Sequence, residues 1–145
     1  MTDIVAGFHE VTDVRTGVTT RTPILRPLAE LQRERAKALQ QTIRDYVDQY
    51  LPPTEREGLA SIASGLAEKK AFGQELTQTE QTVALALMFA RAWTNAAMAL
   101  GGEVAVQCAA CTTVEQLEAV TVDLASLGAP PSISAGEVAL MLRGG

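Results

Sequence analysis

The stretch that decides the fold is TVALALMFARAWTNAAMAL, residues 82–100. Built as a helix, it carries apolar side chains on almost every face, and only Arg91 and Asn95 give it a narrow polar edge. It is long enough to cross a bilayer, but a cation near its centre and an amide one turn later are unfavourable in hydrocarbon. We therefore expect a buried helix of a soluble assembly, either central to its domain or buried between subunits.

Both ends of this helix have recognisable signals. Thr77 and Glu80 have the spacing at which a threonine and a glutamate cap each other's backbone at a helix start. Gly101-Gly102 follows the last apolar residue, and glycine is the usual residue just past a helix end. We predict a helix that opens at Thr77 and ends at Leu100. The next segment, EVAVQCAAC at residues 103–111, fits a strand or a helix, and we favour helical or irregular structure.

A long amphipathic helix is expected earlier in the chain. From Pro27 to about Leu51, apolar residues recur three and four positions apart while charged residues occupy the other faces. Pro27 suits the first turn of a helix, where its missing N–H is not needed. Pro52-Pro53 stops the helix because neither proline can continue its hydrogen-bond ladder.

A second helix should follow the two prolines. Thr54 with Glu57 has capping-box spacing ahead of an apolar run. Lys69-Lys70 complements the negative end of the helix dipole, and Phe72-Gly73 leads into a loop. We predict that this helix ends near residue 70.

Two more elements complete the chain. Thr112 with Glu115 predicts a helix that ends before Gly128, and Ser134 with Glu137 predicts a last short helix. The fold class that follows is mainly α: a helical bundle of four to five helices with an N-terminal extended arm or β-hairpin. We expect the arm at residues 1–26 and the helical domain at residues 27–145.

The N-terminal arm differs in composition from the rest. Valines and threonines flank Arg15-Thr16-Gly17, and Gly17 can supply the positive φ that a tight turn needs. A two-stranded ribbon alone is only marginally stable in water. The arm must therefore lie against its own helices or against another subunit.

Charge and composition exclude several classes of function. Of the 145 residues, 47% are hydrophobic, which is enough for a continuous core. A net charge of −5 argues against a nucleic-acid partner, because phosphate binding depends on clustered Lys and Arg. The first residues, MTDIVAGFHEVTDV, are acidic where an export signal is basic, so none is expected. Basic residues gather between Arg26 and Arg44 and acidic ones from Glu103 onward. Attraction between opposite ends of neighbouring copies is one interpretation, and mixed surface charge is the plainer one.

Cys108-Ala109-Ala110-Cys111 has the CxxC spacing of thiol redox enzymes and of half a zinc site. A structural zinc site needs four ligands, but the chain has no other cysteine and its one histidine, His9, lies in the arm. Small buried apolar residues are the favoured interpretation. Redox or metal chemistry and cross-linking of an oligomer are the alternatives.

No other residue pattern points to catalysis or to a cofactor. His9 lies beside Glu10 in an extended segment, which is a poor setting for a rigid general base. The acid pairs Asp45/Asp48 and Glu55/Glu57 are expected on helix surfaces, solvated or capping a helix. Gly101-Gly102 follows a helix and precedes no Lys-Ser/Thr pair, unlike a phosphate-binding loop. We predict no enzyme, no catalytic or metal-binding residue and no cofactor.

Three residues of the central helix stand out as contact residues. Phe89 and Trp93 lie one turn apart and suit a packed core or a subunit contact. Arg91 must reach an acid, a carbonyl group or water, so it either pins a contact or marks a wet edge of the helix. The residues that we predict to contact a partner are Phe8, Val11, Val14, Val18, Leu28, Leu31, Phe89, Arg91 and Trp93.

The front of the chain resembles a known class of proteins. A short Thr/Val segment with a Thr-Gly turn, DVRTGVTTRTP, precedes a Pro-Leu-led helix, LRPLAELQRERAKALQQTIRDYVDQYLP. This order, over residues 10–53, resembles small tail-fibre-associated and baseplate-associated proteins of tailed bacteriophages. The resemblance implies a virion structural or adaptor protein, assembled in the bacterial cytoplasm, whose partners are tail or fibre proteins and copies of itself. An assembly chaperone or small regulatory binding protein that leaves the particle is the alternative; no membrane partner is expected.

Overall fold

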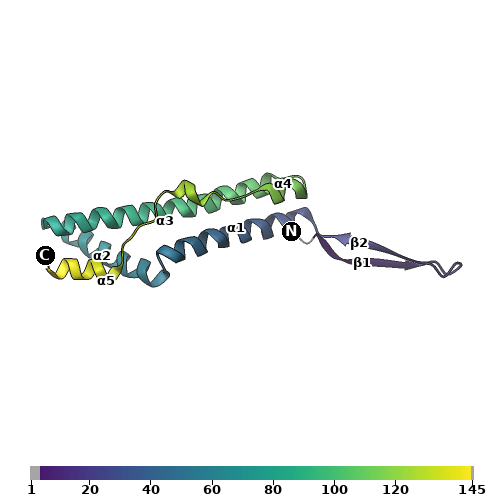
Figure 1. Ribbon diagram of the computed structural model, residues 1–145, viewed down its shortest axis with the longest axis horizontal. Helices are drawn as coiled ribbons and strands as arrows, with labels where there is room; N and C mark the ends of the chain where they lie inside the picture. Colours follow the sequence, from purple (N-terminus) through teal and green to yellow (C-terminus); the bar gives the residue numbers. More distant parts are fainter. Residues whose placement is uncertain (1–3, 145) are drawn as a thin grey trace. The chain divides into compact units, whose positions relative to one another are not determined.

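A computed structural model describes residues 4–144, so the first three residues of the expected arm lie outside the described part. The predicted fold class is confirmed: the described chain is mainly helical, with five α-helices after an N-terminal hairpin of two antiparallel strands (Figure 1). The elements are β1 (Val5–Thr12), β2 (Thr19–Leu25), α1 (Leu28–Tyr50), α2 (Pro53–Ala71), α3 (Gln78–Ala110), α4 (Val114–Ala119), the 3-10 turn η1 (Leu124–Leu127) and α5 (Ala135–Gly144).

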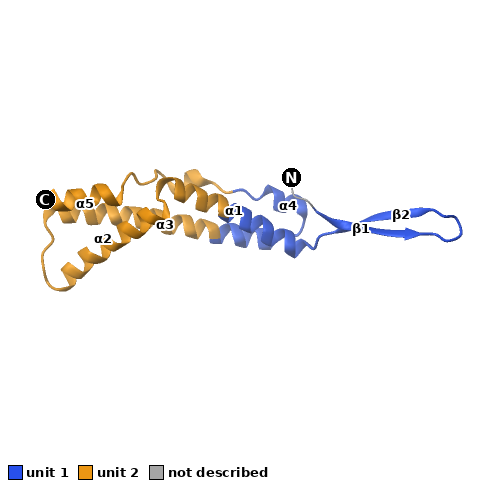
Figure 2. Ribbon diagram, turned by 90° about the horizontal axis from the view of Figure 1, so that it is seen from below, with its two compact units in different colours: residues 1–40, 102–121 blue, residues 41–101, 122–145 orange. Residues whose placement is uncertain are grey.

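The chain groups into two compact units (Figure 2). Unit 1 comprises residues 1–40 and 102–121, and unit 2 comprises residues 41–101 and 122–145. Helices α1 and α3 each contribute residues to both units. The division into an arm at 1–26 and a helical domain at 27–145 stays a prediction.

The hairpin of unit 1 is held by contacts between its own strands. Gly17 has a φ of 70°, which allows the turn between the strands. On one face, Thr12 pairs with Thr19, Arg21 forms an ion pair with Glu10, and the Arg21 guanidinium lies 3.8 Å from the centre of the Phe8 ring. Every residue from Phe8 to Leu25 is exposed, so the predicted hairpin forms without burial against the helices of its unit.

The helical part of unit 1 is tied together by side chains that reach helix ends. Gln32 donates to the Cys111 carbonyl at 2.7 Å, and Arg35 donates to the Val120 carbonyl at 2.7 Å. These carbonyls follow α3 and α4, where the last turns of a helix leave acceptors unpaired. The buried side chains are Leu31 and Leu39 of α1, Val104 and Cys108 of α3, Cys111, and Leu117 of α4.

Unit 2 buries one stripe from each helix that contributes to it. The buried side chains are Ile43, Val47, Leu51, Leu59, Leu66, Val83, Leu87, Ala90, Trp93, Ala97 and Val138. Helix α5 packs against α2, and the Glu55 carboxylate accepts a 2.7 Å hydrogen bond from the Ala135 amide at the first residue of α5. A Cβ at Gly58 would lie 2.7 Å from the Ala135 Cβ, so the packing of α2 on α5 needs a glycine there.

The predicted end of the third helix at Leu100 is wrong. Helix α3 continues through Gly101-Gly102 to Ala110, and neither glycine has a positive φ. Gly101 is buried at the helical position between Ala97 and Val104, which are also buried. Two glycines weaken a helix by roughly 1 kcal/mol each. Burial of the continuous stripe outweighs that penalty, and the ambiguous segment 103–110 is helical as a result.

One predicted capping box, Thr77 with Glu80, forms in full, and at the last helix only the Ser134 half of the predicted pair forms. The Thr77 amide donates to the Glu80 carboxylate at 2.9 Å, and the Glu80 amide donates to the Thr77 hydroxyl at 3.2 Å. Lys69 lies 2.6 Å from the same carboxylate and, with Thr77, holds the pKa of Glu80 below its usual range. At the last helix, the Glu137 amide donates to the Ser134 hydroxyl.

The other two capping predictions are corrected. Thr54 is no cap, because α2 begins at Pro53 and has no side-chain cap. Proline has a fixed φ and lacks an N–H, so it can start the helix itself. At α4 the cap is Thr113, which accepts from the Gln116 amide, one residue later than the predicted Thr112–Glu115 pair. Helix α4 is also shorter than predicted and is followed by η1 before Gly128.

Candidate functional site

Six of the predicted contact residues lie on the surface. Phe8 and Val11 are exposed on β1, and Val14 and Val18 flank the hairpin turn, where Val14 is 97% exposed. Phe89 and Arg91 are exposed on α3, and Leu28 is half-buried at the start of α1. The structure therefore places the predicted surface in two separate regions, the hairpin and α3. That these residues bind a partner stays a prediction.

Leu31 and Trp93 do not belong to that surface. Leu31 is 1% exposed and Trp93 is 4% exposed, so both side chains pack inside the chain. Trp93 lies with its ring 5.8 Å from the ring of Tyr46 and 6.2 Å from that of Tyr50. The apolar periodicity that selected these two residues marks the core side of each helix.

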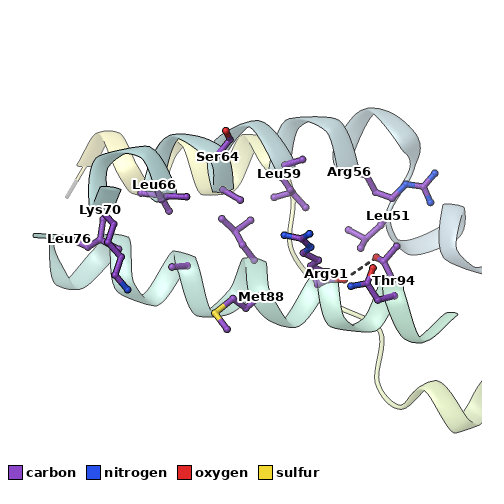
Figure 3. Close-up of a pocket in the computed structure, with 17 residues that line it drawn as sticks. Leu51, Arg56, Leu59, Ser64, Leu66, Lys70, Leu76, Met88, Arg91 and Thr94 are labelled. Atoms are coloured by element: carbon purple, nitrogen blue, oxygen red, sulfur yellow. Dashed lines mark hydrogen bonds between the residues drawn. The ribbon is translucent and has the colours of Figure 1, made fainter. Parts of the chain in front are cut away.

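Unit 2 contains an open groove between α2 and α3, here called the α2–α3 groove, with a volume of about 770 Å³ (Figure 3). Its size is within the range of ligand and peptide sites. Alanines on both helices leave room between them, and five leucines are among the other lining residues. It is lined by Leu51, Arg56, Leu59, Ala60, Ala63, Ser64, Leu66, Ala67, Lys70, Leu76, Ala84, Leu87, Met88, Ala90, Arg91, Thr94 and Asn95.

The rim of the α2–α3 groove is positive. Arg91 from α3 and Lys70 from α2 extend into the space between the helices (Figure 3). Within residues 4–144 neither makes an ion pair, whereas Arg56 lies 3.1 Å from the Asp48 carboxylate. No acidic residue lines the groove. Within a single chain, Arg91 therefore marks a wet edge of the helix, because its exposed guanidinium is left to water.

The hydroxyl groups of the groove have no acid or histidine beside them. Its hydroxyls belong to Ser64 and Thr94, and the Thr94 hydroxyl donates to the Ala90 carbonyl at 2.9 Å. Activation of a hydroxyl needs an adjacent base, and no His, Asp or Glu is present among the lining residues. What the groove offers is apolar surface with two free cations.

Cys108 and Cys111 are buried free thiols at the end of α3. Burial, with the nearby Cys111, raises the pKa of the Cys108 thiol. A raised pKa reduces the thiolate, which is the reactive and metal-binding form. The Cys111 thiol donates to the Gln107 carbonyl at 3.2 Å. This geometry suits packing, the favoured interpretation of the CxxC pair.

The remaining candidates for chemistry are scattered. His9 is exposed on β1 opposite Thr22. Asp48 forms its ion pair with Arg56, and Glu55 caps α5, a role that the sequence did not reveal because its partner lies 80 positions away. In the described chain, residues 4–144, no group of three or more His, Cys, Asp or Glu residues could hold a metal ion.

A face of α3 that no other element covers, here called the α3 face, is the second feature the sequence only partly revealed. It consists of Leu85, Phe89, Ala92, Ala96 and Ala99, with Met88 at its border with the α2–α3 groove, and all six are exposed. The prediction that α3 is central to its own domain is therefore wrong, since only one stripe of it is buried; burial between subunits stays a prediction. By length and composition alone, α3 is also apolar enough to cross a membrane.

The described chain thus offers three surfaces for contact: the hairpin, the α2–α3 groove and the α3 face. No family model, curated protein or solved structure matches it.

Proposed function

We propose that this chain is a non-catalytic structural or adaptor subunit of a virion tail, fibre attachment or baseplate, and that it works by protein–protein contact. The hairpin is its contact element. The helical units carry the hairpin and supply further contact surface.

The observation that carries the proposal is the exposure of the hairpin from Phe8 to Leu25. From Phe8 to Leu25 no residue is buried, although Val11, Val14, Val18 and Ile24 are apolar. A two-stranded ribbon is marginally stable in water, and exposed apolar side chains on it gain stability when a partner covers them. A hairpin that its own helices leave uncovered suits a subunit that completes its burial in an assembly.

The virion assignment is supported by the resemblance over residues 10–53, which covers most of this hairpin and all of α1. The largely apolar lining of the α2–α3 groove is consistent with protein–protein contact. An assembly chaperone would use the same surfaces, but it would leave the finished particle.

The proposal is tested by mass spectrometry of particles purified from cells that express the full chain. We expect the chain at a fixed ratio to the other tail proteins. The double variant Val14→Glu/Val18→Glu places charges on the exposed turn of the hairpin, where they do not disturb packing, and should reduce the retained amount at least ten-fold. Phe72→Glu changes a similarly exposed apolar residue on the loop after α2 and should be retained as wild type.

Absence of the wild-type chain from the particle would overturn the structural role and favour the assembly chaperone. Equal retention of the hairpin variant and the Phe72→Glu control would show that the hairpin is not the contact element. Circular dichroism of each purified variant confirms that its helices are intact.

A further inference from the structure

Helix α3 has two apolar sides, and the chain uses only one of them. The side chains of Val83, Leu87, Ala90 and Ala97 are buried in unit 2. On the opposite side, Leu85 is 68% exposed and Phe89 is 54% exposed. A helix that is apolar all round is stable in water when its second side is also covered.

The α3 face has the spacing of a helix–helix seam. Leu85, Phe89, Ala92, Ala96 and Ala99 follow one another at steps of four, three, four and three, which is the average period of 3.5 residues found in coiled coils. The alanines allow a second helix to approach closely. An occupant of this face is therefore a helix that runs along α3.

The order of large and small residues points to a second copy of this chain in antiparallel orientation. If two copies of α3 cross at Ala92, Leu85 lies opposite Ala99 of the second copy, and Phe89 lies opposite Ala96. Each layer then pairs one large with one small side chain, as close packing requires. In a parallel pair Phe89 would meet its own equivalent, and the alanine layers would leave a gap.

Charge and area agree with self-association. Between Thr82 and Gly102 the only charged residue is Arg91, which points into the α2–α3 groove, so pairing through the α3 face buries no charge. Leu85, Met88 and Phe89 each expose on the order of 100 Å² of apolar surface. With the alanines, two copies together would cover about 1,000 Å², near the minimum for a specific interface.

We propose that two copies of the chain associate through their α3 faces as an antiparallel pair with its two-fold axis at Ala92. The inference deepens the proposed function by naming one partner, but it rests on a surface distinct from the hairpin. It can therefore fail while the particle experiment succeeds.

The test is size-exclusion chromatography with light scattering over a concentration series of the full chain. Wild type should approach twice the mass of one chain. Phe89→Lys and Ala96→Glu each place an unpaired charge in the seam, so each variant alone should remain at the mass of one chain. Mixed in equal amounts they should recover the doubled mass, because in the antiparallel pair the introduced lysine faces the introduced glutamate and the other layer keeps its native residues.

Phe72→Lys is the matched control, since Phe72 is also an exposed aromatic residue but lies outside the α3 face, and it should dimerise like wild type. A wild-type chain that keeps the mass of one chain at every concentration overturns the proposal. Failure of the mixture to dimerise overturns the antiparallel geometry. A wild-type monomer that floats with phosphatidylcholine vesicles would show that lipid covers the α3 face and would likewise overturn self-association.

Discussion

Gly102 occupies an exposed position inside α3, and a Cβ built there meets no atom within 4 Å. It also lacks a positive φ, so alanine fits its backbone. An unfolded chain with alanine at this position has fewer conformations than one with glycine, so it loses less entropy when it folds. The effect of replacing Gly102 by alanine therefore tests whether α3 continues through the glycine pair.

Gly102→Ala should therefore raise the free energy of unfolding by roughly 0.5–1 kcal/mol, measured by urea denaturation followed by circular dichroism. Gly73→Ala is the control, because Gly73 has a φ of 78°, which disfavours any side chain. This substitution should lower the free energy of unfolding by roughly 1–2 kcal/mol. If Gly102→Ala destabilises the protein as Gly73→Ala does, α3 ends at the glycine pair.

At the scale of single elements, the four Thr or Ser residues that the sequence predicts as caps differ in what their side chains bond. Thr77 and Glu80 bond each other's backbone across the start of α3, and Lys69 adds an ion pair to that site. Thr54 has the same sequence spacing to Glu57, yet α2 has no side-chain cap. The two threonines make a matched comparison of the same motif with and without its hydrogen bonds.

Thr77→Ala should lower the free energy of unfolding by about 1 kcal/mol, and Thr54→Ala should change it by less than about 0.5 kcal/mol. The partners of Glu80 hold its pKa below the usual range near 4.5. Its ionised form therefore stabilises the fold at neutral pH, and this contribution is lost as the pH falls through the lowered pKa. Urea denaturation of Glu80→Gln, repeated at a series of pH values from 7 downward, should show a destabilisation that shrinks in acid. An effect that is the same at every pH would contradict the role of the ionised Glu80.

Local signals were enough to predict most elements. Prolines and capping residues placed the starts of α1, α3 and α5 to within about a residue, because these signals act on the next turn of the backbone. The continuation through Gly101-Gly102 was missed because it depends on the burial of Gly101 with residues of other elements. The α2–α3 groove was missed for a similar reason. The distance between two helices depends on contacts between them, and the sequence pattern of either helix does not give that distance.

At the scale of the whole molecule, the net charge and the uncharged α3 face act in opposite directions on self-association. A net charge of −5 makes copies of the chain repel one another in general. The α3 face contains no charge, and the hairpin presents valines around its turn. Copies of the chain can therefore approach most easily through the uncharged α3 face, which favours a specific contact over general association.

The ring cluster around Trp93 gives the molecule a spectroscopic reporter. Trp93 is the sole tryptophan of the sequence, and its buried ring lies beside Tyr46 and Tyr50 in unit 2. Its emission reports the core of that unit alone, whereas far-UV circular dichroism reports every helix. Because α1 and α3 contribute to both cores, we expect the two signals to change at one urea concentration. Two separate midpoints would show that the units unfold independently, with the tryptophan identifying the order in which they do so.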